Sequence, residues 1–65
     1  MSNHSDIVYV VQLADGFHVV CECKGVSQKN SVSPVIPHEG AALFAANQMA
    51  GRLGARFEPS VRVQQ

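Results

Sequence analysis

The stretch from Asp6 to Lys24 most constrains the fold of this chain, because it has the composition of a two-stranded β-hairpin. Both arms are rich in valine, isoleucine, tyrosine and phenylalanine, which suit a pleated, half-buried surface. The dipeptide Asp15-Gly16 between the arms is a strong hairpin signal. The sequence therefore predicts an antiparallel hairpin over residues 6–24, against which the other segments must pack.

The length of the turn decides which side chains share a face of the hairpin. A two-residue turn at Asp15-Gly16 would mix apolar and polar residues on both faces. A three-residue loop from Ala14 to Gly16 places glycine where a type I turn with a bulge requires positive φ. We therefore predict the three-residue loop. The inner face would then hold Ile7, Tyr9, Val11, Leu13, Phe17, Val19, Cys21 and Cys23, and the outer face Val8, Val10, Gln12, His18, Val20, Glu22 and Lys24.

The predicted outer face carries a small apolar group, formed by Val8, Val10 and Val20. One interpretation is a modest apolar spot on a solvated sheet, since single surface valines are common. The other interpretation is a contact with a second subunit or a protein partner, because so small a sheet exposes edges and faces that favour association.

The segments after the hairpin predict further elements of one α+β domain over residues 6–65, preceded by a polar, mobile leader at 1–5. Residues 25–37 are typical of a loop, with a short edge strand near Val32 to Ile36. The alanine-rich segment at about 38–53 predicts one helix that ends before Gly54. Alternation at residues 60–64 indicates a C-terminal strand. The expected fold is a small antiparallel sheet of two to four strands packed against a single helix.

The predicted helix has a stripe of mostly small side chains that should face the hairpin, namely Ala42, Ala45, Ala46, Met49, Ala50 and Leu53. Phe44 falls on the opposite side, near Gln48 and Gly51. Either the loop 25–37 or the C-terminal tail covers this phenylalanine, or it is an exposed aromatic anchor for a protein partner.

Size and charge bound the functions open to this chain. With 65 residues it can form one domain with a thin stability margin, which small proteins often supplement by oligomerisation. Five basic residues balance five acidic ones, so strong attraction to nucleic acid or anionic membranes is not expected and self-association is favoured. No segment is typical of a signal peptide or a membrane span, which predicts a cytoplasmic protein.

No motif for catalysis or metal binding stands out. Cys21 and Cys23 lack the second ligand pair of a zinc site, so we interpret them as buried structural cysteines. His38 and Glu39 are neighbours on the predicted helix and cannot face each other, and no serine lies in a nucleophile motif. We therefore predict no catalytic residues, no bound metal and no cofactor.

The function that these patterns favour is a small protein-binding or adaptor module without enzymatic activity, which acts as a homodimer and contacts an unidentified protein. The interaction candidates are Phe44, Val8, Val10, Val20 and Gln48. The alternative is a nucleic-acid-binding protein that inserts its sheet into the major groove, because a small sheet followed by one helix occurs in such domains. Its contacts would come from Lys24, Lys29, Arg52, Arg56 and Arg62. Zero net charge and Glu22 on the outer face oppose this alternative.

Overall fold

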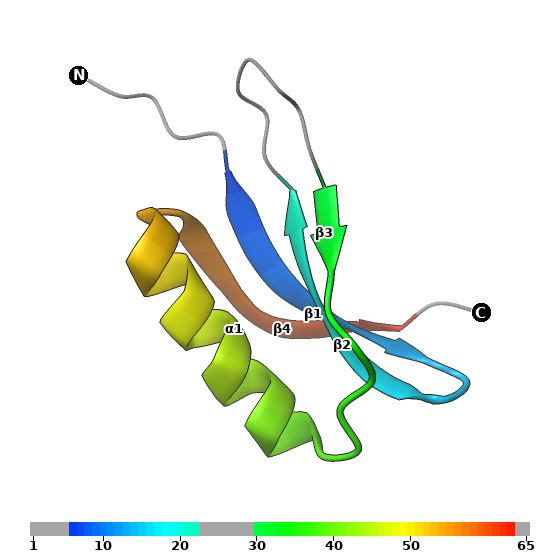
Figure 1. Cartoon of the computed structure of the whole chain (residues 1–65). Helices are drawn as coiled ribbons and strands as arrows, with labels where there is room; N and C mark the ends of the chain where they lie inside the picture. Colours follow the sequence, from blue (N-terminus) through cyan, green and yellow to red (C-terminus); the bar gives the residue numbers. More distant parts are fainter. Residues whose placement is uncertain (1–5, 23–29, 64–65) are drawn as a thin grey trace.

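A computed structural model describes residues 6–22 and 30–63 of the chain. The elements are β1 (Ile7–Leu13), β2 (Gly16–Glu22), β3 (Asn30–Val32), α1 (Glu39–Leu53) and β4 (Arg56–Val63). They form one four-stranded sheet in the order β3-β2-β1-β4, with α1 lying across one of its faces (Figure 1). The predicted α+β fold is confirmed. The sheet is mixed rather than wholly antiparallel, because β4 runs parallel to β1.

The C-terminal strand begins earlier than the sequence pattern predicts. Gly54 ends α1 in the left-handed conformation, with φ 67°, and its N–H donates to the carbonyl of Ala50. The chain then enters β4 almost at once, at Arg56. Pro59 lies inside β4 and interrupts the alternation that identifies a strand, but proline is tolerated on an edge strand. The register of β4 against β1 shifts between Val8 and Val10, which accommodates this irregular stretch.

The hairpin register differs from the prediction, and the three-residue loop is wrong. Only Ala14 and Asp15 form the turn, so that Leu13 pairs with Gly16 and Val10 with Val19. Consequently the inner and outer residues of β1 are exchanged relative to the prediction, whereas those of β2 face as expected. The physical reason is that β1 is apolar on both faces from Ile7 to Val11, so alternation along β1 cannot identify its inner side.

Gly16 is required by a close approach of the chain rather than by a bulge. Its φ is 143°, and a Cβ atom built on it would lie 2.7 Å from Cγ2 of Val35 and 3.2 Å from the carbonyl oxygen of Ile36. Next to it, Phe17 and Ile36 exchange two backbone hydrogen bonds of 3.0 and 2.7 Å. The edge strand expected near Val32 to Ile36 therefore lies earlier, as β3 at Asn30–Val32, and Ile36 adds one isolated bridge to β2.

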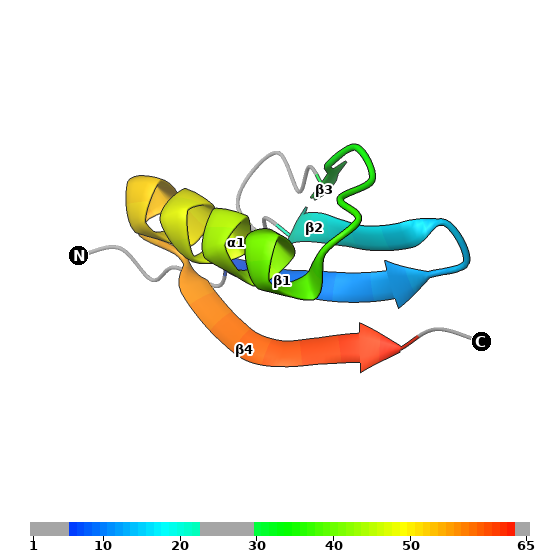
Figure 2. The same cartoon turned by 90° about the horizontal axis from the view of Figure 1, so that it is seen from below.

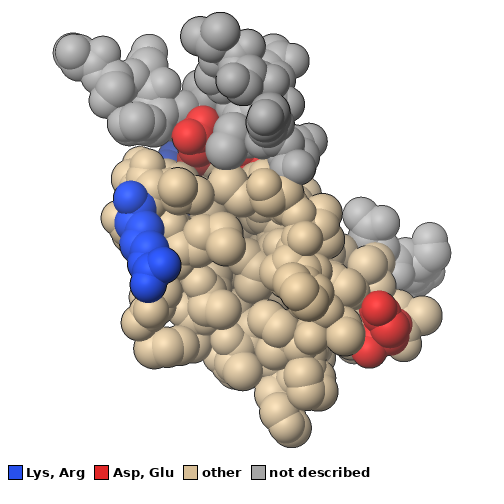
Figure 3. Space-filling view, viewed as in Figure 1, with Lys and Arg blue, Asp and Glu red and all other residues tan. Residues whose placement is uncertain are grey.

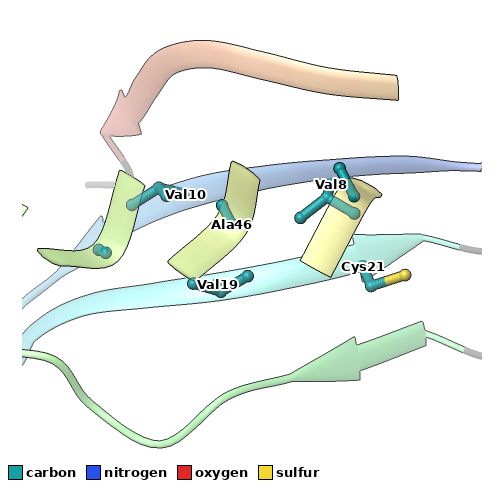
Figure 4. Packing of buried hydrophobic residues seen from close by; sticks show 7 residues of the cluster. Val8, Val10, Val19, Cys21 and Ala46 are labelled. Atoms are coloured by element: carbon teal, nitrogen blue, oxygen red, sulfur yellow. The ribbon is translucent and has the colours of Figure 1, made fainter. Parts of the chain in front are cut away.

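The core lies between the sheet and α1, as Figure 4 shows. Val8, Val10, Val19 and Cys21 of the sheet pack against the helix at Ala42, Ala46 and Ala50. The small alanine side chains allow the helix to lie close to the branched valines. From the expected helix stripe, Ala45 and Met49 are partly buried, and Leu53 is exposed. Cys21 is buried as predicted, and Cys23 lies outside the described residues.

The predicted exposure of Val8 and Val10 is wrong. Both side chains are fully buried beneath α1, because the two-residue turn directs the even-numbered residues of β1 toward the helix. The leader at 1–5 and residues 23–29, which include Lys24 and Lys29, lie outside the described part of the chain. Within the described part, no helix has the length and hydropathy needed to cross a membrane.

Candidate functional site

The face of the sheet that points away from α1 carries a second apolar cluster. Tyr9, Val11 and Val20 are buried there, and Ile7 packs against them. Figures 1 and 2 show α1 on one side of the sheet only, and no other described element lies over these residues. We call this surface the open sheet face, and it comprises Ile7, Tyr9, Val11, Leu13, Val20 and Val32.

A shallow hollow of about 230 Å³ lies on the open sheet face. Its lining residues are Tyr9, Val11, Leu13, Val20 and Val32. The lining contains no ionised side chain, and its two most exposed members are Leu13 and Val32, with 37% and 62% of their surface exposed. Leu13 lies at the end of β1 and Val32 at the end of β3. These two side chains form the exposed apolar rim of the hollow.

A chain of polar contacts crosses the open sheet face beside the hollow. The guanidinium carbon of Arg62 lies 3.7 Å from the centre of the Tyr9 ring, and its Nη2 donates to Oε1 of Glu58 at 2.8 Å. The Tyr9 hydroxyl donates to Oε2 of Glu22 at 2.5 Å. The contacts therefore connect β4, β1 and β2. Because Arg62 covers the ring, Tyr9 is buried although no described element lies above it.

These contacts fix the charge states of the groups involved. The hydrogen bond to Glu22 raises the pKa of Tyr9 above its usual range, so the phenol stays protonated and donates at neutral pH. The Arg62 guanidinium lowers the pKa of Glu58, so this carboxylate stays ionised. Tyr9 therefore serves as a hydrogen-bond donor that orders the face.

His18 flanks the hollow on the side of the hairpin turn. Its Nδ1 lies 2.8 Å from the carbonyl oxygen of Ser33, and its Nε2 lies 3.0 Å from Oδ1 of Asp15. Ser33 is itself attached to β2, because its N–H donates to the carbonyl of Val19 at 2.8 Å and its Oγ accepts from the N–H of Val19 at 2.9 Å. His18 thus connects the turn after Leu13 to the residue after Val32.

The pKa of His18 is raised by the Ser33 carbonyl and then by Asp15. The same contact lowers the pKa of Asp15. The two acceptors stabilise an added proton on the imidazole ring, and the ring N–H in turn stabilises the ionised carboxylate of Asp15.

Comparison with known proteins identifies no relative of this chain. No protein-family model, no curated protein and no solved structure matches it. The site must therefore be interpreted from its own chemistry.

The five predicted interaction candidates do not form one surface. Val8 and Val10 are in the core, Val20 belongs to the open sheet face, and Phe44 and Gln48 lie on the exposed side of α1. Phe44 has 64% of its surface exposed, as the partner-anchor interpretation requires. Figure 3 shows that the side of the molecule bearing α1 has few charged side chains. A second hollow of about 220 Å³ runs along this helix, at Ala45, Gln48, Met49 and Arg52.

Sequence reasoning missed the outer positions of β1, namely Tyr9, Val11 and Leu13, and also missed Val32 on β3. The signal that could have identified them is the unbroken apolar run at the start of β1, which indicates a strand that is apolar on both faces. Such a strand contributes to the core on one side and leaves a second apolar face to be covered.

The arginines proposed for nucleic-acid contacts are dispersed. Arg52 lies on α1, whereas Arg56 and Arg62 lie toward opposite ends of β4. Arg62 is already engaged by Glu58 and Tyr9. The arginines of residues 30–63 therefore form no continuous basic surface. Among the described residues, no group of three histidine, cysteine, aspartate or glutamate side chains is arranged to hold a metal ion.

Proposed function

We propose that this protein is a small, non-catalytic protein-binding module that forms a homodimer through its open sheet face. The observation that supports the proposal is a sheet that is apolar on both faces, with its only described helix covering one of them. Apolar sheet faces are stable when another layer covers them. A second copy of the chain would supply that layer and give the order helix, sheet, sheet, helix.

The charges around the open sheet face favour a second copy as the occupant. The register places Arg56 and Arg62 on this face at β4, and Glu22 on the same face at β2. A central two-fold axis along the strands would place β4 of one copy over β3 of the other, next to β2. Such an axis preserves the position along the strands, and Arg56 and Glu22 both pair with Ile7, so Arg56 of each copy would approach Glu22 of its partner, as a self-complementary interface requires. Zero formal net charge adds no long-range repulsion between the copies.

The area of the sheet indicates how tight such a dimer would be. The four strands contain 7, 7, 3 and 8 residues, and with a rise of about 3.3 Å and a strand spacing of about 4.8 Å they span a flat area of about 400 Å². Stable interfaces bury about 800 Å² of accessible surface on each partner, and weaker ones bury less. We therefore expect association in the micromolar range, where the monomer and the dimer can both be measured.

The test is sedimentation equilibrium of the full chain across the micromolar range, with two matched variants. Val32→Asp adds a charge to the rim of the open sheet face. Val63→Asp adds the same charge at a side chain of almost equal exposure, 63% against 62%. The control residue pairs with Gln12, and so lies on the opposite face of the sheet from Val32. Both changes are at the surface, so neither should unfold the domain.

We expect the wild type and Val63→Asp to approach twice the chain mass of 7.0 kDa, and Val32→Asp to remain a monomer. Undiminished association of Val32→Asp would exclude the open sheet face as the interface. A wild-type chain that remains monomeric throughout the range would overturn the proposed function.

A further inference from the structure

His18 connects the two segments that carry the exposed rim of the hollow. Asp15 follows Leu13 by two residues and Ser33 follows Val32 directly, and both are held by the same imidazole ring. We propose that His18 is a proton-controlled latch that orders this rim, so that the homodimer is tighter at acidic than at alkaline pH. This inference rests on the proposed function, because it describes the regulation of that same face.

The chemistry of the two contacts requires a proton. Both atoms that face the ring, the Ser33 carbonyl oxygen and the Asp15 carboxylate oxygen, accept hydrogen bonds and cannot donate them. A neutral imidazole has one N–H and one lone pair, so it can satisfy only one of these acceptors. The imidazolium has two N–H groups and can satisfy both. Loss of the proton therefore releases either the turn after Leu13 or the residue after Val32.

The contact between His18 and Ser33 affects how firmly the end of β3 is held against β2. Besides its contact with His18, Ser33 exchanges two hydrogen bonds with the backbone of Val19, through its own N–H and its hydroxyl. Val32, directly before it, pairs with Val20 at the end of the short strand β3. A strand of three residues has few ladder bonds to hold it, so these contacts at Ser33 determine how firmly Val32 is held.

Among the charged groups near His18, Asp15 is the one that contacts its ring. Within the described residues, the segment 30–36 contributes no ionisable side chain. Tyr9 on β1 is neutral in this pH range, and Glu22 on β2 is engaged by the Tyr9 hydroxyl. Arg62 lies on the same face across Val11, but it is paired with Glu58. The helix packs on the opposite face of the sheet.

The direction of the pH effect follows from the sign of the shift. The contacts raise the pKa of His18 above its ordinary value of about 6.5. A group whose pKa is raised in the ordered state contributes fully below its ordinary pKa, and the contribution is lost as pH rises through the raised value. Self-association should therefore weaken between about pH 6 and pH 8.

The experiment measures the dimer dissociation constant by sedimentation equilibrium from pH 5.5 to pH 8, in reducing buffer. The wild type is compared with His18→Gln, which retains a hydrogen-bonding amide but cannot titrate. His38→Gln is the control, because His38 is an exposed residue at the start of α1. We expect the dissociation constant of the wild type and of His38→Gln to rise about tenfold across this range, as for the loss of one charge-assisted hydrogen bond. His18→Gln should show a flat profile.

The outcomes separate this inference from the proposed function. A wild type that dimerises with no pH dependence, or a His18→Gln variant that keeps the full dependence, would refute the latch and leave the dimer intact. A wild type that never dimerises would refute the proposed function. The latch is then tested in the monomer by thermal unfolding at several pH values, while NMR follows the protonation of His18. The melting temperature must fall as pH rises in the wild type but not in His18→Gln. Parallel melting curves for the two chains would refute the latch there as well.

Discussion

Gly16 allows the segment at 35–36 to approach the hairpin closely, because only a hydrogen atom fits between them. The nearest atoms to a built Cβ belong to the Val35 side chain and the Ile36 backbone. At Gly51, by contrast, a Cβ would meet nothing within 4 Å. The two glycines therefore have opposite roles, since one permits a tertiary contact and the other is an ordinary helix position that glycine weakens.

We predict opposite effects of alanine at these positions. Gly16→Ala should lower the free energy of unfolding by about 1–3 kcal/mol, because the new methyl group overlaps Val35 and φ 143° is unfavourable for alanine. Gly51→Ala should raise it by about 1 kcal/mol, because alanine favours helix. Urea denaturation of both variants measures the two changes. A neutral Gly16→Ala would mean that Val35 moves away at no cost.

At the scale of single elements, β1 defines the architecture because it is central in the sheet and apolar on both sides. It pairs with β2 on one edge and with β4 on the other. Its even-numbered valines contact α1, and its odd-numbered residues form the open sheet face. The helix complements it with alanines on the side toward the sheet and leaves Phe44 on the opposite side. The loss of stability caused by a substitution on β1 or α1 therefore depends on whether the side chain faces the core.

This pattern yields a prediction for a buried and an exposed residue. Val10→Ala should destabilise the protein by about 2 kcal/mol, because it removes two methyl groups from a fully buried site and leaves a cavity. Phe44→Ala should change stability by no more than about 0.5 kcal/mol, because the ring is mostly exposed and alanine favours helix. Thermal or chemical denaturation separates the two. A loss above about 3 kcal/mol for Phe44→Ala would place its ring in a buried contact.

The elements of the fold could be predicted from sequence, but the register of the hairpin could not. Alanine content and Gly54 are local signals, and the helix lies where they indicate. The inner face of β1 depends instead on a long-range contact, the approach of residues 35–36 to Gly16. The open sheet face was missed for the same reason. His18 was predicted to face outward, but its contact with Ser33 joins residues 15 positions apart and has no local signal.

On the scale of the whole molecule, a chain of 65 residues buries only a small apolar surface, and the described residues supply it with one helix packed on one sheet. The sheet has one apolar face covered and a second without a described cover, so association with a second copy would bury further apolar surface. If two copies share the open sheet face, folding and dimerisation are coupled. The stability of the domain then depends on its own concentration, which a monomer's stability does not.

This coupling gives a prediction for thermal unfolding. Above the dissociation constant, a tenfold increase in protein concentration stabilises a folded dimer by about 1.4 kcal/mol relative to unfolded chains. For two chains of 65 residues unfolding together, this corresponds to a rise in Tm of about 5 °C. Val63→Asp should show the same rise. The Tm of Val32→Asp should not change with protein concentration, because a charge on the rim prevents the second copy from covering the sheet. If the Tm of the wild type does not change with concentration, self-association through the open sheet face does not stabilise the fold.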